Sequence, residues 1–286
     1  MAIKTILVPT DFSKTAANAL NYAVKVAEKT KSKIILLHAY QIDLYSPDLP
    51  VEYFNQINSL TKGNSEKQLV SLISKVKRSS KIIIDHISIE YPTVGCILET
   101  IVKKKIDLVI MGTKGASGIK EIFLGSVAGE VIEKAKCPVL AIPLKASYTG
   151  LKRITYASDY HSSDITILKK LVEIAKIFKS KINVLHIAVA EFTMDSEKDI
   201  LKTFINKVDR KVEYNNLTFQ ILYGKDEEKE IEKYLKSKTT DLLSISTRKR
   251  TLLEKFLSKS ITKTLSYHTI IPLLAFHYKK SSVVFI

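Results

Sequence analysis

The chain has 286 residues and 45% hydrophobic content, enough for one large or two ordinary folded domains, so we exclude a disordered protein. No apolar run approaches the roughly 20 residues that span a bilayer, and a signal-peptide pattern is absent, so we expect a cytoplasmic protein. The two cysteines, Cys96 and Cys137, form neither a disulfide framework nor a metal-ligand spacing, and we expect both to be buried thiols.

The net charge of +16 invites a nucleic-acid partner, but its distribution along the chain does not favour one. Residues 1–150 hold 20 Lys and Arg against 13 Asp and Glu, and residues 151–286 hold 25 against 16, so the two parts carry +7 and +9. Runs such as Lys103–Lys105 and Arg248–Arg250 are typical of solvated faces. We therefore expect no nucleic-acid binding.

In chain order, short β-rich runs alternate with helical patterns through the first 145 residues. The predicted strands are Ile3–Val8, Lys33–Ala39, Lys81–Ile89, Leu108–Met111 and Val139–Ile142. The predicted helices are Ala16–Ala27, with Ser13 as a possible N-cap, Leu69–Val76, Val94–Val102 and Val127–Ile132. Nearly continuous apolar strands alternating with helices predict an α/β fold with a five-stranded, parallel, doubly wound sheet. Between the second strand and the second helix, Gln41–Leu60 contains two prolines and predicts an excursion beside the sheet edge.

The pattern then repeats. At an offset of 148 residues Asp11 matches Asp159, His38 matches His186 and Ser32–Ile34 matches Ser180–Ile182, while the later strands match at an offset of 134. The second copy has therefore lost 14 residues, which we assign to the segment after its second strand. We expect two tandem domains, at residues 1–146 and 151–286, joined by a short polar linker and forming a pseudodimer within one chain, with a homodimer as a further option. The closing strands Val139–Ile142 and Leu273–Phe276 are expected to meet.

Ligands of a doubly wound sheet bind beyond the carboxyl ends of its strands, where three segments of the first copy end. The first is Pro9-Thr10-Asp11, whose carboxylate is either a hydrogen-bond acceptor for a ligand or a helix cap. In the second segment, His38-Ala39-Tyr40, backbone groups are placed to contact an adenine edge, while His38 itself is typical of a packed histidine.

The third segment is a glycine loop that follows the buried strand ending at Met111. Gly112 and Gly115 permit close backbone approach and positive φ, and Gly125-Ser126 opens a helix whose free amides favour negative charge. Ser126 is either a phosphate donor or an ordinary N-cap. A mobile loop without a ligand is the alternative.

The spacing Gly112-x-x-Gly115, nine residues, then Gly125-Ser126 resembles the nucleotide signature of the universal stress protein family. Val8-Pro-Thr-Asp11 resembles that family's opening strand, and Cys137-Pro-Val-Leu140 its closing strand. The resemblance covers residues 1–144 and, more weakly, 151–277. It implies flavodoxin-like domains of the adenine nucleotide alpha hydrolase type that bind ATP, with a divalent ion such as Mg²⁺ on the triphosphate. By position, the implied nucleotide-binding residues are Pro9, Thr10, Asp11, Ala39, Met111, Gly112, Gly115, Gly125 and Ser126.

The second copy departs from this signature, because Ser246, Lys249 and Lys259 stand where the first copy has glycine. Side chains there would fill the space that a phosphate needs, so we expect one nucleotide site per chain. Ser126 is retained as Ser260.

Three functions remain open. The resemblance implies an ATP-binding stress-response sensor or regulator that acts through an unknown protein partner. A weakly ATP-hydrolysing or nucleotidyl-transfer enzyme is the second, although the chain has no Walker-type loop and no obvious catalytic base, so no catalytic or metal-ligating residue is assigned. A nucleotide-free interaction scaffold is the third.

Overall fold

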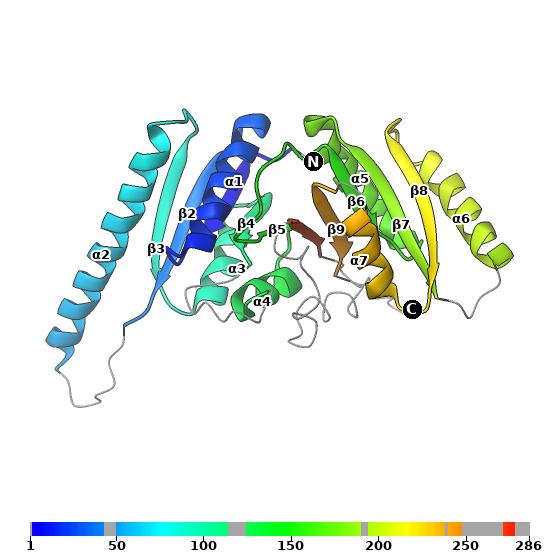
Figure 1. Ribbon diagram of the computed structural model, residues 1–286. Helices are drawn as coiled ribbons and strands as arrows, with labels where there is room; N and C mark the ends of the chain where they lie inside the picture. Colours follow the sequence, from blue (N-terminus) through cyan, green and yellow to red (C-terminus); the bar gives the residue numbers. More distant parts are fainter. Residues whose placement is uncertain are drawn as a thin grey trace, which may run out of the picture.

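A computed structural model describes residues 2–42, 50–113, 124–189, 194–237, 240–247 and 271–277. Within these ranges the chain forms one ten-stranded sheet with the strand order β3-β2-β1-β4-β5-β10-β9-β6-β7-β8 (Figure 1). The first half contains β1 (Thr5–Pro9), α1 (Lys14–Thr30), β2 (Lys33–Tyr40), α2 (Val51–Lys77), β3 (Ile84–Glu90), α3 (Thr93–Lys103), β4 (Leu108–Gly112), α4 (Ser126–Lys134) and β5 (Val139–Ile142). The second half contains β6 (Arg153–Ala157), α5 (Ser162–Phe178), β7 (Lys181–Val189), α6 (Met194–Asp209), β8 (Leu217–Gly224), α7 (Glu227–Ser237), β9 (Leu242–Ser246) and β10 (Leu273–Phe276).

Each half is a parallel sheet covered on both faces, as the apolar strands predict. One core cluster joins the sheet to α1, α2, α5 and α6, and a second joins the opposite face to α3, α4 and α7. The doubly wound α/β fold is therefore confirmed. The strand order within each half follows the Rossmann pattern 3-2-1-4-5 rather than the flavodoxin pattern 2-1-3-4-5.

The predicted strands of the first half agree with the observed ones to within three residues at each end. Ser13 caps α1 as expected, because its Oγ accepts a hydrogen bond from Ala16 N. The second helix begins earlier than predicted, because α2 starts at Val51 rather than at Leu69 and so takes up half of the excursion predicted for Gln41–Leu60. No proline follows Pro50 in this segment, and the first turns of α2 need no buried face, since Val51 and Tyr53 are exposed.

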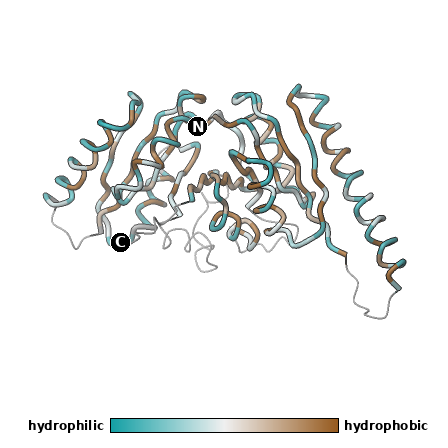
Figure 2. Tube along the Cα trace, turned by 180° about the vertical axis from the view of Figure 1, so that it is seen from behind, coloured by the Kyte–Doolittle hydropathy of each residue, from teal (hydrophilic) through white to brown (hydrophobic). Residues whose placement is uncertain are grey.

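The halves meet through their closing strands, as predicted. β5 and β10 pair antiparallel, with Leu140 opposite Leu274, and Figure 2 shows hydrophobic residues along the central strands. The paired strands repeat at the predicted offsets, and α6 has 16 residues where α2 has 27, which places the deletion after the second strand. The boundaries at residues 146 and 151 stay a prediction.

Both predicted thiols are buried and free of disulfide bonds. No helix in the described ranges combines the length and the hydropathy that crossing a membrane requires.

Candidate functional site

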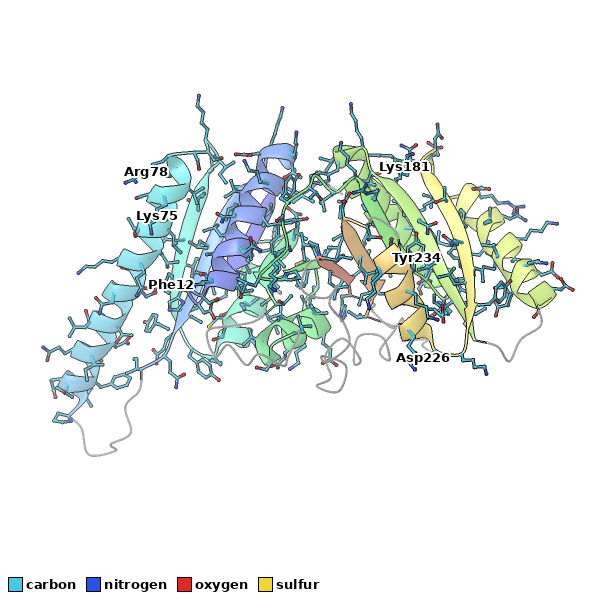
Figure 3. The ribbon with its side chains drawn as sticks, viewed as in Figure 1. Phe12, Lys75, Arg78, Lys181, Asp226 and Tyr234 are labelled. Carbon is cyan, nitrogen blue, oxygen red and sulfur yellow. The ribbon has the colours of Figure 1, made fainter. Side chains whose placement is uncertain are left out.

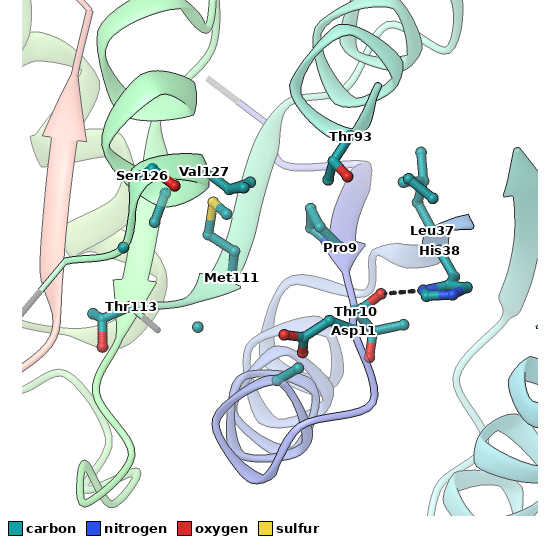
Figure 4. Close-up of a pocket in the computed structure, with 15 residues that line it drawn as sticks. Pro9, Thr10, Asp11, Leu37, His38, Thr93, Met111, Thr113, Ser126 and Val127 are labelled. Carbon is teal, nitrogen blue, oxygen red and sulfur yellow. Dashed lines mark hydrogen bonds between the residues drawn. The ribbon is translucent and has the colours of Figure 1, made fainter. Parts of the chain in front are cut away.

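A pocket of about 200 Å³ opens at the carboxyl ends of the first-half strands, where β1 lies between β2 and β4 and the strand order reverses (Figure 4). Eight of the nine predicted residues line it; Gly115 lies outside the described residues. The eight are Pro9, Thr10, Asp11, Ala39, Met111, Gly112, Gly125 and Ser126. The fold thus brings them together, while their role in binding stays a prediction.

In the turn after β1, one residue caps α1 and another lines the pocket. Ser13 is the N-cap of α1, and Asp11 Oδ1 accepts a hydrogen bond from Ser13 N at 3.1 Å. Asp11 therefore shapes the turn but is not the cap of the helix. Its carboxylate lines the pocket, beside Thr10 in Figure 4.

His38 has a structural role that both halves repeat. Its Nδ1 lies 2.7 Å from Thr10 O, and its ring centroid lies 4.4 Å from that of Phe12. In the second half, His186 Nδ1 lies 2.9 Å from Ser158 O and its ring 4.6 Å from that of Tyr160. The packed-histidine interpretation therefore fits, although His38 also borders the pocket.

Gly112 is needed for close approach rather than for positive φ. A Cβ added there would lie 2.9 Å from Thr15 Cγ2 and 3.1 Å from the Thr15 backbone carbon. Among the described glycines only Gly150 has positive φ, so that part of the prediction is wrong for Gly112. The first turn of α1 packs directly on the end of β4, and a side chain at position 112 would push it away.

The two ends of the glycine loop are tied together. Gly125 N donates to Thr113 O at 2.6 Å, and Thr113 N donates to Ile142 O at 3.0 Å. Gly125 is the N-cap of α4, so the alternative that Ser126 is that cap is wrong; Ser126 is the first helical residue and is exposed beside the pocket. The amino terminus of α4, with its free amides and positive dipole end, therefore borders the pocket.

Six further lining residues were missed from the sequence. They are Ala16, Leu37, Thr93, Thr113, Val127 and Ala128. Thr113 and Val127 directly follow a predicted residue, and Leu37 and Ala128 lie two residues from one. Ala16 and Thr93 instead lie in first turns of helices at this edge, which is the signal that could have found them. Asp11 is the only carboxylate among the lining residues that the structure describes.

The second half places a carboxylate where the first half has the small side chain of Ala16. At the 148-residue offset this residue is Asp164, which is buried. Its Oδ2 accepts hydrogen bonds from Ser158 Oγ at 2.6 Å and from Asp159 N at 3.2 Å. Ser246, which replaces Gly112, is also buried, whereas Lys249 and Lys259 lie outside the described residues.

These features define a class: tandem doubly wound α/β proteins with a pocket at the switch point of the first half. The universal stress protein family model matches residues 2–143. A universal stress protein of Methanocaldococcus jannaschii is 34% identical over 169 residues, covering 50% of this chain and 97% of that protein. The chain belongs to the universal stress protein family.

One solved structure matches the tandem architecture over nearly the whole chain. A universal stress protein from Archaeoglobus fulgidus matches 97% of this chain and 99% of its own with a TM-score of 0.71 and 17% identity, which shows the fold alone. A universal stress protein solved in complex with cAMP covers 50% of this chain and 98% of its own, at 26% identity and a TM-score of 0.39.

Proposed function

We propose that this protein is an ATP-binding stress-response regulator with one nucleotide site per chain, in the first-half pocket. The observation that carries the proposal is the convergence of the Asp11 turn, the Ala39 backbone and the amino terminus of α4 on one pocket. A carboxylate accepts hydrogen bonds from ribose hydroxyls, and helix amides donate to phosphate. The glycine signature fits the ATP-binding role that the family resemblance implies.

Asp164 is a second reason, besides the lost glycines, for restricting the proposal to one site. A buried carboxylate at this position would place negative charge close to any phosphates bound at the second-half turn, and its hydrogen bonds to Ser158 and Asp159 hold it there. This adds an electrostatic reason to the loss of the three signature glycines.

In this proposal, the divalent ion would be coordinated mainly by the phosphate oxygens of ATP. The described residues contain no cluster of three or more His, Cys, Asp or Glu side chains able to hold a metal. Mg²⁺ keeps several waters and is commonly held by phosphates with few protein ligands, which suits a pocket with one carboxylate.

Isothermal titration with ATP and Mg²⁺ tests the proposal. We expect one site per chain, abolished in Gly115→Lys, which installs the residue that the second copy carries at the matching position. Asp11→Ala should weaken binding by about 1.5–3 kcal/mol, or roughly 10- to 150-fold, because it removes a charged acceptor. Asp159→Ala, the matched change in the second half, should leave the affinity unchanged.

Absence of binding by the wild-type protein would overturn the proposal and favour the scaffold function, which the packing role of Gly112 also supports. Two sites per chain would contradict the argument from Asp164. Titrations with AMP and cAMP establish which adenine nucleotide is preferred. Phosphate release that Asp11→Ala abolishes would instead favour the weak ATPase.

A further inference from the structure

A groove of about 990 Å³ lies at the opposite end of the first-half sheet from the pocket, where β1 and β2 begin and α1 and α2 end. Its six basic residues are Lys4, Lys31, Lys33, Lys77, Arg78 and Lys81. We call it the basic groove. Its walls contain one carboxylate, Glu28, which forms an ion pair with Lys25 at 3.3 Å. All six basic side chains are exposed, and none takes part in the ion pairs seen among the described residues.

The second half repeats the central part of this arrangement. At the offset of 148, Lys4 matches Lys152, Lys31 matches Lys179 and Lys33 matches Lys181, all exposed. The intervening serines carry the structural contact in both copies, because Ser32 Oγ donates to Ile3 O and Ser180 Oγ to Leu151 O. Among the matched lysines, Lys152 Nζ donates to Phe178 O at 3.1 Å, whereas within the described ranges the structure shows no side-chain hydrogen bond for Lys31, Lys33, Lys179 or Lys181.

Two of the matched lysines occupy a backbone conformation that favours glycine. Lys31 and Lys179 end α1 and α5 with φ of 57° and 53°. Cations near the carboxyl end of a helix offset its dipole, but Lys29 and Lys176 already lie in the last turns of these two helices. Lys31 and Lys179 are therefore not needed for that purpose. Both copies thus place a lysine, rather than glycine, at the left-handed end of the matching helix, and both of these side chains are exposed at the same edge of the sheet.

Folding collects these cations at one end of the molecule. Figure 3 shows Arg78 of the first half and Lys181 of the second at the same, upper, end, and Asp226 at the lower end. Because α1 and α5 contact each other, the ends that carry Lys31 and Lys179 belong to neighbouring helices. The even division of charge along the sequence is therefore compatible with one concentrated basic face.

We propose that the basic groove binds a linear phosphate polymer through its phosphates, with Lys179 and Lys181 extending the contact onto the second half. The groove is concave, which suits a strand better than a planar membrane. Tyr, Phe and His are absent from its lining residues, so bases would not be stacked and binding would be independent of sequence. Single-stranded RNA and inorganic polyphosphate share this chemistry.

Fluorescence anisotropy with a labelled oligouridylate, and competition by polyphosphate, tests the proposal. Wild-type binding should weaken steeply between roughly 50 and 200 mM salt. The Lys31→Gly/Lys179→Gly variant should lose about 1.4 units of the log–log salt slope and bind roughly tenfold more weakly, since each lost phosphate contact removes about 0.7 units. Melting curves check that the variant is folded.

The matched control is Lys67→Ala/Lys170→Ala, which removes two exposed charges from the middle of α2 and α5 and should bind as the wild type does. Displacement of the oligouridylate by polyphosphate would show that both polymers occupy the groove, whereas binding of only one polymer would identify that polymer as the ligand. Equal losses in both double variants, no binding of either polymer, or binding only to anionic vesicles would overturn the proposal. Added ATP should not compete, because the pocket lies at the far end of β2, so the two proposals fail separately.

Discussion

Single residues at the carboxyl edge combine structural and proposed binding roles. Gly112 admits the first turn of α1, and Asp11 accepts the hydrogen bond of Ser13 N while lining the pocket. A substitution at either position therefore changes the turn as well as any ligand contact. Asp159→Ala is the appropriate control because Asp159 follows β6 as Asp11 follows β1.

The reactivity of the Cys137 thiol tests whether this side chain is buried in the folded protein. Desolvation raises the pKa of its thiol to about 12, so only about one molecule in ten thousand would carry the reactive thiolate at pH 8. In a Cys96→Ser variant we expect Ellman's reagent to leave the native protein unmodified between pH 7 and 9, and to label one thiol in denaturant. A labelling rate that rises with a midpoint near the ordinary value of about 8.5 would contradict this burial.

At the scale of elements, α1 and α5 both end in a residue with a strained backbone conformation. Lys31 and Lys179 adopt left-handed backbone, although glycine would relieve about 1 kcal/mol of strain there. The matching hydrogen bonds of Ser32 N to Ala27 O and Ser180 N to Ala175 O fix this conformation. Because the same hydrogen bond follows both helices, the strained conformation is a shared feature of the two copies.

Lys179→Gly should therefore raise the free energy of unfolding by about 0.5 kcal/mol, after subtracting roughly 0.5 kcal/mol for the greater freedom of glycine in the unfolded chain. Urea denaturation measures the change. Lys179→Ala keeps a Cβ at the same φ and should show no gain. An equal gain in both variants would mean that lost charge repulsion, not backbone strain, is responsible.

At the scale of the whole molecule, the pairing of β5 with β10 makes one sheet of two repeats. Leu140 and Leu274 lie opposite each other and belong to one core cluster that also contains α1 and α5 residues. The core of one half thus continues into the other. We expect the halves to unfold together.

A double-mutant cycle tests this continuity. Leu140→Ala and Leu274→Ala should each cost about 2–5 kcal/mol of stability. Their combined cost should differ from the sum by about 0.5–3 kcal/mol, because the side chains share one site. Leu36→Ala on β2, four strands from β10 and roughly 19 Å away, should add to Leu274→Ala within about 0.5 kcal/mol. Full additivity of Leu140 and Leu274 would contradict a shared core.

The sequence by itself determined the duplicated α/β elements, the bounds of β5, the seam between β5 and β10, and eight residues that meet in the pocket. These features follow from local patterns: apolar runs form buried strands, and glycine and capping residues mark where strands pass into helices. The strand order, the contact of Thr15 with Gly112 and the burial of Asp164 depend on which segments pack together, which no local pattern specifies.

The distribution of charge depends on tertiary structure most of all. Along the chain the excess lysines are spread over both halves, and they predict no patch. Parallel strands all begin at one edge of a sheet, so lysines at or just before the starts of strands far apart in sequence, such as Lys33 and Lys81, meet at that edge. Only the fold turns an evenly charged sequence into a molecule with a basic groove.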